Sequence, residues 1–160
     1  MHHIIIPNSP MMNYYMENNI ILDASYLIAL AFSHDPHHKQ AEIMLQEIIS
    51  IKPVFVTNNY LLSEAMTMTL LRSKDCQFVE ILKKHTFGTY KNICKVFYIN
   101  QQFDEHIYNL FIRQEKYRGE FLSFADCSII IQARTQKIKT IFTFDSTFKQ
   151  FAEELKIVGI

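Results

Sequence analysis

Short apolar runs alternate along the chain with longer segments in which apolar residues recur every three or four positions. The short runs are rich in β-branched and aromatic residues and have the length of strands buried on both faces. They occupy residues 19–23, 53–57, 95–99 and 140–144, and a shorter fifth run lies at 157–160. The sequence therefore predicts four to five buried strands.

The longer segments have the spacing of helices that bury one face. Ser25 is a candidate N-cap for the first, Pro36 suits the opening of the second, and Asn58 or Asn59 precedes the third. Strands that alternate with helices form parallel sheets covered on both faces, so the predicted class is α/β. The predicted helices cover approximately residues 25–32, 36–50, 59–71, 74–85, 102–116 and 123–136.

The composition fits one globular domain of 160 residues, of which 49% are hydrophobic and 20% charged. Residues 1–18 contain no Lys or Arg and lack the apolar stretch of a signal peptide. We therefore expect an N-terminal extension over 1–18 and a domain over 19–160. No apolar run approaches the length of about twenty residues that a membrane span needs. Three cysteines without CxxC spacing fit reduced thiols, which favours a cytoplasmic protein.

The net charge is zero, yet the two halves of the chain differ in sign. Residues 1–80 contain four Lys or Arg and eight Asp or Glu, whereas residues 81–160 contain twelve and eight. A basic half is compatible with polyanion binding, because the local potential governs association more than the total charge does. An ordinary mixed surface explains the same counts.

Four carboxylates occupy positions where a parallel sheet gathers functional groups. Asp23 and Asp145 end predicted strands, at the sheet edge where α/β proteins bind ligands. Glu64 and Asp126 lie early in predicted helices and share a face with apolar residues three or four positions away. Carboxylates on buried faces are rare unless they are paired or bind a metal.

Each acid also has a structural interpretation. Ser123 and Asp126 have the spacing of a capping box, and Asp23 and Asp145 can cap the turns that follow them. The four acids also have to be considered together, because any two carboxylates about 4 Å apart repel by roughly 4 kcal/mol at an effective dielectric constant near 20. No Lys or Arg adjoins any of the four in sequence, so their convergence requires a cation. Oxygen ligands alone favour Mg²⁺ or Mn²⁺.

Four segments, in order, resemble the motifs of PIN-domain ribonucleases, most of all those of VapC-type toxins of toxin–antitoxin pairs. The segments are ILDASYLIAL, TNNYLLSEAM, LSFADCSIII and IFTFDSTF, and the resemblance spans residues 20–150. It implies a Rossmann-like PIN fold, with a central parallel sheet flanked by helices, and a metal-dependent endoribonuclease activity. It also implies a homodimer that a co-expressed antitoxin protein holds inactive.

The resemblance assigns the family's acidic quartet to Asp23, Glu64, Asp126 and Asp145. The three aspartates would hold one or two Mg²⁺ or Mn²⁺ ions, and Glu64 would bind the metal or orient the attacking water. The hydroxyls expected near the metal or its ligands are those of Ser25, Thr143 and Ser123. Candidates for following the RNA backbone are Lys116, Arg118 and Arg134, and aromatic side chains near the cleft are candidates for stacking on unpaired bases.

Two other functions remain open at this point. A receiver-like signalling domain also binds Mg²⁺, although Asp23 lacks the acidic neighbour that such a site needs. A catalytically inactive PIN-like module would bind RNA or protein without cleaving either. No glycine-rich phosphate loop is present, which argues against an NTPase. His34, His37 and His38 are close in sequence, but adjacent solvent-facing histidines usually neither bind metal nor catalyse.

Overall fold

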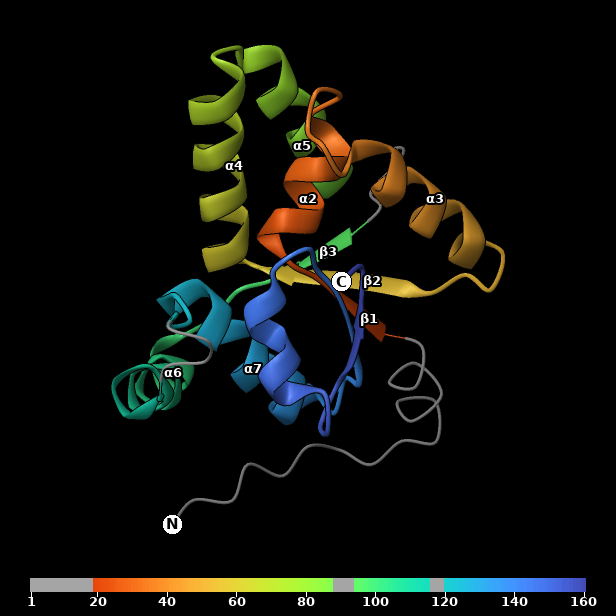
Figure 1. Cartoon of the computed structure of the whole chain (residues 1–160). Coiled ribbons are helices and arrows are strands. Elements are labelled where there is room, and N and C mark those ends of the chain that lie inside the picture. Colours follow the sequence, from red (N-terminus) through yellow and green to blue (C-terminus); the bar gives the residue numbers. More distant parts are fainter. Residues whose placement is uncertain (1–18, 88–93, 116–119) are drawn as a thin grey trace.

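Five parallel strands form one sheet in the order β3-β2-β1-β4-β5 (Figure 1). The computed structural model describes residues 19–87, 94–115 and 120–160, and it confirms the predicted α/β class. Residues 1–18, which the sequence predicts to be an extension, lie outside the described residues. The strands are β1 (Asn19–Leu22), β2 (Val54–Asn58), β3 (Cys94–Phe97), β4 (Thr140–Phe142) and β5 (Lys156–Val158).

The strand order places a topological switch point beside β1. This strand pairs with β2 on one side, with Ile20 opposite Phe55, and with β4 on the other, with Ile21 opposite Ile141. The chain moves outward from β1 to β3 and then returns to β4, so its right-handed connections lie on opposite faces of the sheet. A crevice is expected where the carboxyl ends of β1 and β4 meet.

The helices likewise lie in two groups, on opposite faces of the sheet. Figure 1 shows α2, α4 and α5 in the upper part of the view and α6 and α7 below them, with the sheet between the two groups. None of the helices in the described part of the chain combines the length and the hydropathy needed to cross a bilayer. The helices are α2 (Ala24–Ala31), α3 (His38–Ile49), α4 (Asn59–Ser73), α5 (Cys76–Phe87), α6 (Gln101–Arg113) and α7 (Phe124–Gln136), and a short 3₁₀ helix, η1 (Ser146–Phe151), follows β4.

The core lies on both faces of the central strands, as their unbroken apolar sequence predicts. Ile21 and Leu22 of β1 and Ile141 of β4 are completely buried. The helices on the two faces contribute Leu27 and Ile130, which are also buried. The central strands therefore hold fixed positions, and the residues directly after them are placed with little freedom.

Two helix starts differ from the prediction. The candidate N-cap Ser25 does not cap α2, and Asp23 does, as its structural interpretation predicts: the carboxylate of Asp23 accepts hydrogen bonds from the backbone N–H groups of Ala24 and Ser25. The second correction concerns α3, which begins at His38 and not at Pro36. The cap of α2 matters for the site, because its hydrogen bonds fix the carboxylate of Asp23 at the end of β1.

Candidate active site

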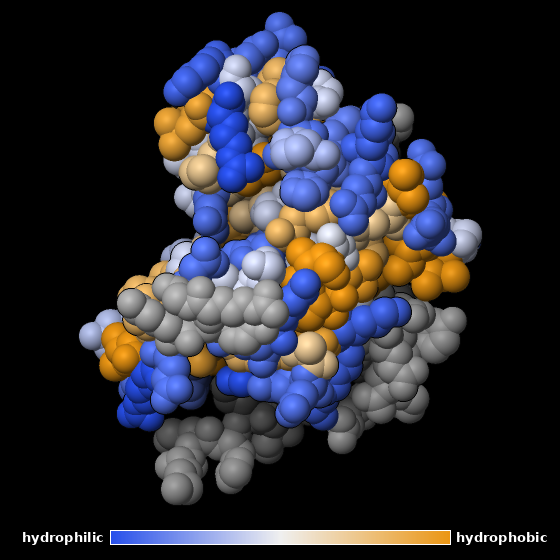
Figure 2. Space-filling view, viewed as in Figure 1, coloured by the Kyte–Doolittle hydropathy of each residue, from blue (hydrophilic) through white to orange (hydrophobic). Residues whose placement is uncertain are grey.

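All four predicted acids line one pocket at the carboxyl ends of β1 and β4. The pocket has a volume of about 460 Å³, and its walls include Asp23, Glu64, Asp126 and Asp145. Each acid comes from a different part of the fold: the end of β1, helix α4, helix α7 and the start of η1. In Figure 2 the surface is hollowed between the part built by α4 and α5 and the part built by α6 and α7.

Asp23 is the most deeply buried of the four, with 2% of its surface exposed. Its Oδ1 accepts a hydrogen bond from the N–H of Ala24 at 2.6 Å, and its Oδ2 accepts one from the Thr143 hydroxyl at 2.7 Å. The Ser25 hydroxyl also donates to Oδ2. Burial nevertheless raises the pKa of Asp23, against the lowering effect of these hydrogen bonds.

Ser25 and Thr143 join Asp23 to the segment that carries Asp145. The N–H of Phe144 donates to the Ser25 hydroxyl, and the N–H of Asp145 donates to the Thr143 hydroxyl, each at 2.9 Å. The two hydroxyls themselves lie 3.2 Å apart. They therefore hold the end of β1 and the chain after β4 in a fixed relation.

Asp145 caps η1, as its structural interpretation predicts. Its Oδ1 accepts hydrogen bonds from the N–H of Thr147 at 2.8 Å and from the Thr147 hydroxyl at 2.7 Å. Both bonds use the same carboxylate oxygen, and Asp145 still lines the pocket. Capping and a place in the site are thus compatible.

Asp126 also has both roles. Its backbone N–H donates to the Ser123 hydroxyl at 3.0 Å, and its Oδ2 accepts from the Ser123 N–H at 2.8 Å, which completes the predicted capping box. The pKa of Asp126 is raised to about 7, first of all by burial and then by the charges of Asp23 and Glu64, while the hydrogen bonds with Ser123 oppose the rise. Ser123 therefore orients this acid.

Glu64 is the acid without a structural partner. Its Oε2 is buried and has no hydrogen-bond partner within the described residues. Burial raises the pKa of Glu64, and the charges of Asp23 and Asp145 add to that effect, while Arg72 opposes it. A buried, unpaired carboxylate oxygen costs free energy that a cation in the pocket would recover.

These residues fit a divalent cation in their chemistry. Every acidic side chain that lines the pocket offers carboxylate oxygens, and oxygen atoms are the ligands that Mg²⁺ and Mn²⁺ prefer. In the ranges that the structure describes, no group of three His, Cys, Asp or Glu side chains is already drawn together tightly enough to enclose an ion. The acids line a shared space, and a bound ion would draw them inward.

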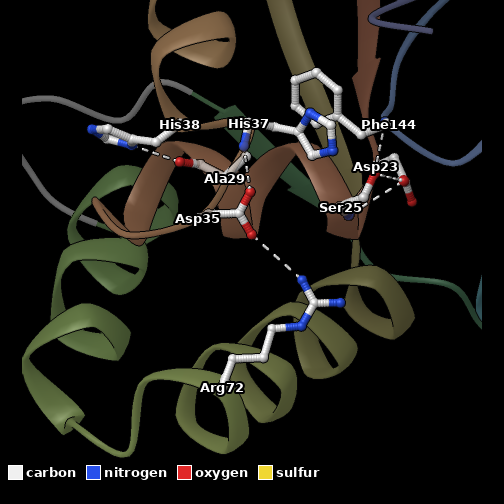
Figure 3. A network of polar contacts seen from close by, with 8 residues as sticks. All are labelled: Asp23, Ser25, Ala29, Asp35, His37, His38, Arg72 and Phe144. Carbon is white, nitrogen blue, oxygen red and sulfur yellow. Dashed lines mark hydrogen bonds and ion pairs between the residues drawn. The ribbon is translucent and has the colours of Figure 1, made fainter.

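Three further residues line the pocket (Figure 3): the sequence did not single out two of them, and it offered His37 only as an unfavoured metal ligand or catalyst. Arg72, Asp35 and His37 line the pocket beside the acids. Arg72 extends from α4 toward Asp35, with 3.5 Å between the guanidinium and the carboxylate. Arg72 lies eight residues after Glu64, with Met68 between them, so helical spacing alone indicates that it shares their face.

Of the three predicted RNA-contact residues, one lies in the part of the chain that the structure describes. Lys116 and Arg118 lie outside the described residues. Arg134 lies near the end of α7 and donates two hydrogen bonds to Glu154, at 2.9 and 2.8 Å. This pair borders a separate, smaller hollow, so the structure gives Arg134 a partner within the protein rather than a place at the acidic pocket.

The family model described as the PIN domain matches residues 20–154. Among solved structures, Mycobacterium tuberculosis VapC20, described as a toxin that cleaves the sarcin–ricin loop, has a TM-score of 0.67 and 22% sequence identity, and the match covers 82% of this chain and 93% of that chain. A chain of the VapBC2 structure from Rickettsia felis, bound to promoter DNA, has a TM-score of 0.58 and 13% identity, with 87% and 96% covered. At such identities the likeness shows a shared fold. No curated protein matches the sequence significantly.

Proposed function

The chain belongs to the PIN domain family, and we propose that it is a metal-dependent endoribonuclease that hydrolyses RNA phosphodiester bonds. The observation that carries the proposal is the meeting of four carboxylates, from four parts of the fold, around one pocket. The pKa values of Asp23, Glu64 and Asp126 are all raised there, first of all by burial. Folding alone gives no reason to bring such groups together, whereas a divalent cation gives them a common partner.

The proposed roles follow from the contacts of each acid. Asp23, Asp126 and Asp145 would hold one or two Mg²⁺ or Mn²⁺ ions through their carboxylate oxygens. A bound ion supplies a water of lowered pKa and neutralises charge on the scissile phosphate. Glu64, with its Oε2 unpaired within the described residues and its pKa raised, would orient the attacking water and accept its proton, because a base whose pKa lies nearer neutrality is more effective.

The proposal extends to a role as the toxin of a type II toxin–antitoxin pair, acting in the cytoplasm as a homodimer. The fold shared with VapC20 and VapBC2 supports this role. An antitoxin that places an Arg or Lys in the acidic pocket would neutralise Asp23 and Asp126 and exclude metal by charge alone.

A cleavage assay on single-stranded RNA tests the proposal. The wild-type protein is expected to cleave with Mg²⁺ or Mn²⁺ and to stop in excess EDTA. Asp126→Asn, purified in the same way, is expected to be folded and inactive, which excludes a contaminating nuclease. Glu105→Gln, which changes an exposed acid on α6, serves as the matched control and is expected to cleave normally.

Two results would contradict the proposal. Undiminished cleavage in excess chelator would remove the metal from the mechanism. Full activity of Asp126→Asn would return this residue to a purely structural role. RNA binding by the wild type without cleavage under any metal condition would instead identify the inactive PIN-like module.

A further inference from the structure

We infer that the ring of His37, stacked on Phe144 at the edge of the acidic pocket, forms a platform on which an RNA base next to the cleaved bond stacks. This inference rests on the proposed function and adds a base-binding site to it. It concerns residues that neither the acidic quartet nor its hydroxyl partners include.

His37 and Phe144 form a nearly parallel ring pair. Their ring centroids are 4.4 Å apart and their planes differ by 10° (Figure 3). Phe144 in turn stacks on Tyr26, with centroids 6.0 Å apart and planes at 24°. Tyr26 is completely buried, and its hydroxyl donates to the carbonyl of Ala41 at 2.9 Å. The outermost ring of this series is therefore supported by the core.

His37 occupies an N-cap position but does not use its side chain as a cap. Its ring makes no capping hydrogen bond to α3, although N-cap side chains commonly serve that purpose. The Asp35 carboxylate instead holds the His37 backbone, since Oδ1 accepts from the His37 N–H at 2.9 Å. Asp35 also pairs with Arg72 through Oδ2. The loop is thus fixed from both sides, while the imidazole is left available.

His37 is exposed and also lines the pocket at the edge of the acidic site. His37 is exposed although Phe144 covers one face of its ring, so another aromatic group has access to the opposite face. Both residues line the same pocket as the four acids. Phe144 immediately precedes Asp145, and its N–H donates to the Ser25 hydroxyl, which itself donates to Asp23. A base on His37 therefore lies next to the carboxylates that would hold the metal.

An unpaired nucleobase is the ligand that suits this arrangement. Bases in single-stranded RNA stack on aromatic side chains, including His, and every base offers a π-face. The charged residues that line the pocket are five acids and one arginine, and this arginine, Arg72, is paired with Asp35. A planar group with little negative charge is therefore favoured over a second phosphate. An exposed ring pair beside an acidic centre thus fits one nucleotide whose adjoining phosphate reaches the metal site.

The test compares His37→Ala, His37→Phe and the control His106→Ala, which removes an exposed histidine on α6. The probe is a single-stranded RNA that spans the mapped cleavage position, and binding is measured in excess EDTA, so that the proposed metal-dependent cleavage does not occur. Removing a stacked base or its platform changes affinity by roughly 5- to 150-fold, and we expect His37→Ala to weaken binding within this range. His37→Phe should bind nearly as the wild type does, because it retains the stacking ring, and His106→Ala should be unchanged.

A second series identifies the base itself. Single abasic nucleotides are placed in turn on either side of the cleavage position. At one of these positions, the abasic substitution should weaken binding by the wild type and remove the difference between wild type and His37→Ala. In cleavage assays on unmodified RNA, His37→Ala should raise KM by a similar factor and change kcat little.

The outcomes separate this inference from the proposed function. If the wild type cleaves RNA and His37→Ala binds equally well, the stacking site is wrong and the nuclease remains. The inference is also overturned if the loss in His37→Ala persists with every abasic RNA or is not restored by Phe. If the wild type neither binds nor cleaves RNA, both proposals fail together.

Discussion

Asp126→Asn should stabilise the metal-free protein at neutral and higher pH. In the folded chain, burial raises the pKa of Asp126 from its ordinary value of 3.8 to about 7. Between these two values the folded state retains a proton that the unfolded state has released. The free energy of unfolding therefore falls as pH rises from about 4 to about 7, and it levels off when both states are ionised.

The magnitude follows from the size of the pKa difference. One pKa unit corresponds to about 1.4 kcal/mol, so a difference of about three units gives an upper limit of roughly 4 kcal/mol. An Asn side chain keeps one oxygen that can accept from the Ser123 N–H, so the capping box is largely retained. Asp23 and Glu64 also have raised pKa values and titrate in both proteins. The difference between the two proteins therefore reports mainly on Asp126.

Urea unfolding in EDTA, at several pH values between about 4 and about 8, measures this difference. The two proteins should be nearly equal in stability at the acid end, and Asp126→Asn should be more stable by up to about 4 kcal/mol at the alkaline end. Adding Mg²⁺ at the alkaline end should stabilise the wild type more than the variant, because the ion binds the folded site. Parallel stability curves over the whole pH range, or a variant less stable at pH 8, would show that Asp126 carries no buried charge.

Three further outcomes follow from the contacts. Glu64→Gln should lower kcat by about 10²- to 10⁴-fold, the usual contribution of a general base, in RNA cleavage assays where Glu105→Gln serves as control. Ser25→Ala removes the hydrogen bonds of this hydroxyl with the Asp23 carboxylate and with the Phe144 N–H. It should therefore lower the free energy of unfolding, measured in urea, by about 1–3 kcal/mol. Arg134→Ala breaks an exposed ion pair with Glu154 and should cost less than about 1 kcal/mol in the same assay, with cleavage unchanged; a large loss of cleavage would restore Arg134 as an RNA contact.

The sheet and its acids could be predicted because their signals are local. An apolar run that ends in a carboxylate, as residues 19–23 do, specifies both a buried strand and a group at its carboxyl end. In a parallel sheet these ends share one edge, so Asp23 and Asp145 are brought together by topology alone. Helical spacing then indicates which face carries Glu64 and Asp126. The pocket that all four line agrees with this prediction.

The remaining pocket residues depend on contacts between distant parts of the chain. Asp35 and Arg72 are 37 positions apart, and His37 meets Phe144 across more than a hundred residues. A surface loop such as the one before α3 has no periodicity to reveal its partners. The cap of α2 could not be assigned from the sequence for a different reason, because Ser25 and Asp23 are both suitable N-cap residues. Asp23 is the cap because β1 ends immediately before it and α2 begins immediately after it.

The capping contacts of the acids and the catalytic roles proposed for them are not alternatives in this fold. Asp23, Asp126 and Asp145 each accept hydrogen bonds from backbone N–H groups at the start of a helical segment. Those bonds restrict the direction of each carboxylate, although the acids would still have to move closer together to enclose an ion. Glu64 differs, since within the described residues it has a buried oxygen without a partner, and its pKa is raised by burial and by its acidic neighbours. In the proposed mechanism the three oriented aspartates would hold the cation, and Glu64 would move the proton.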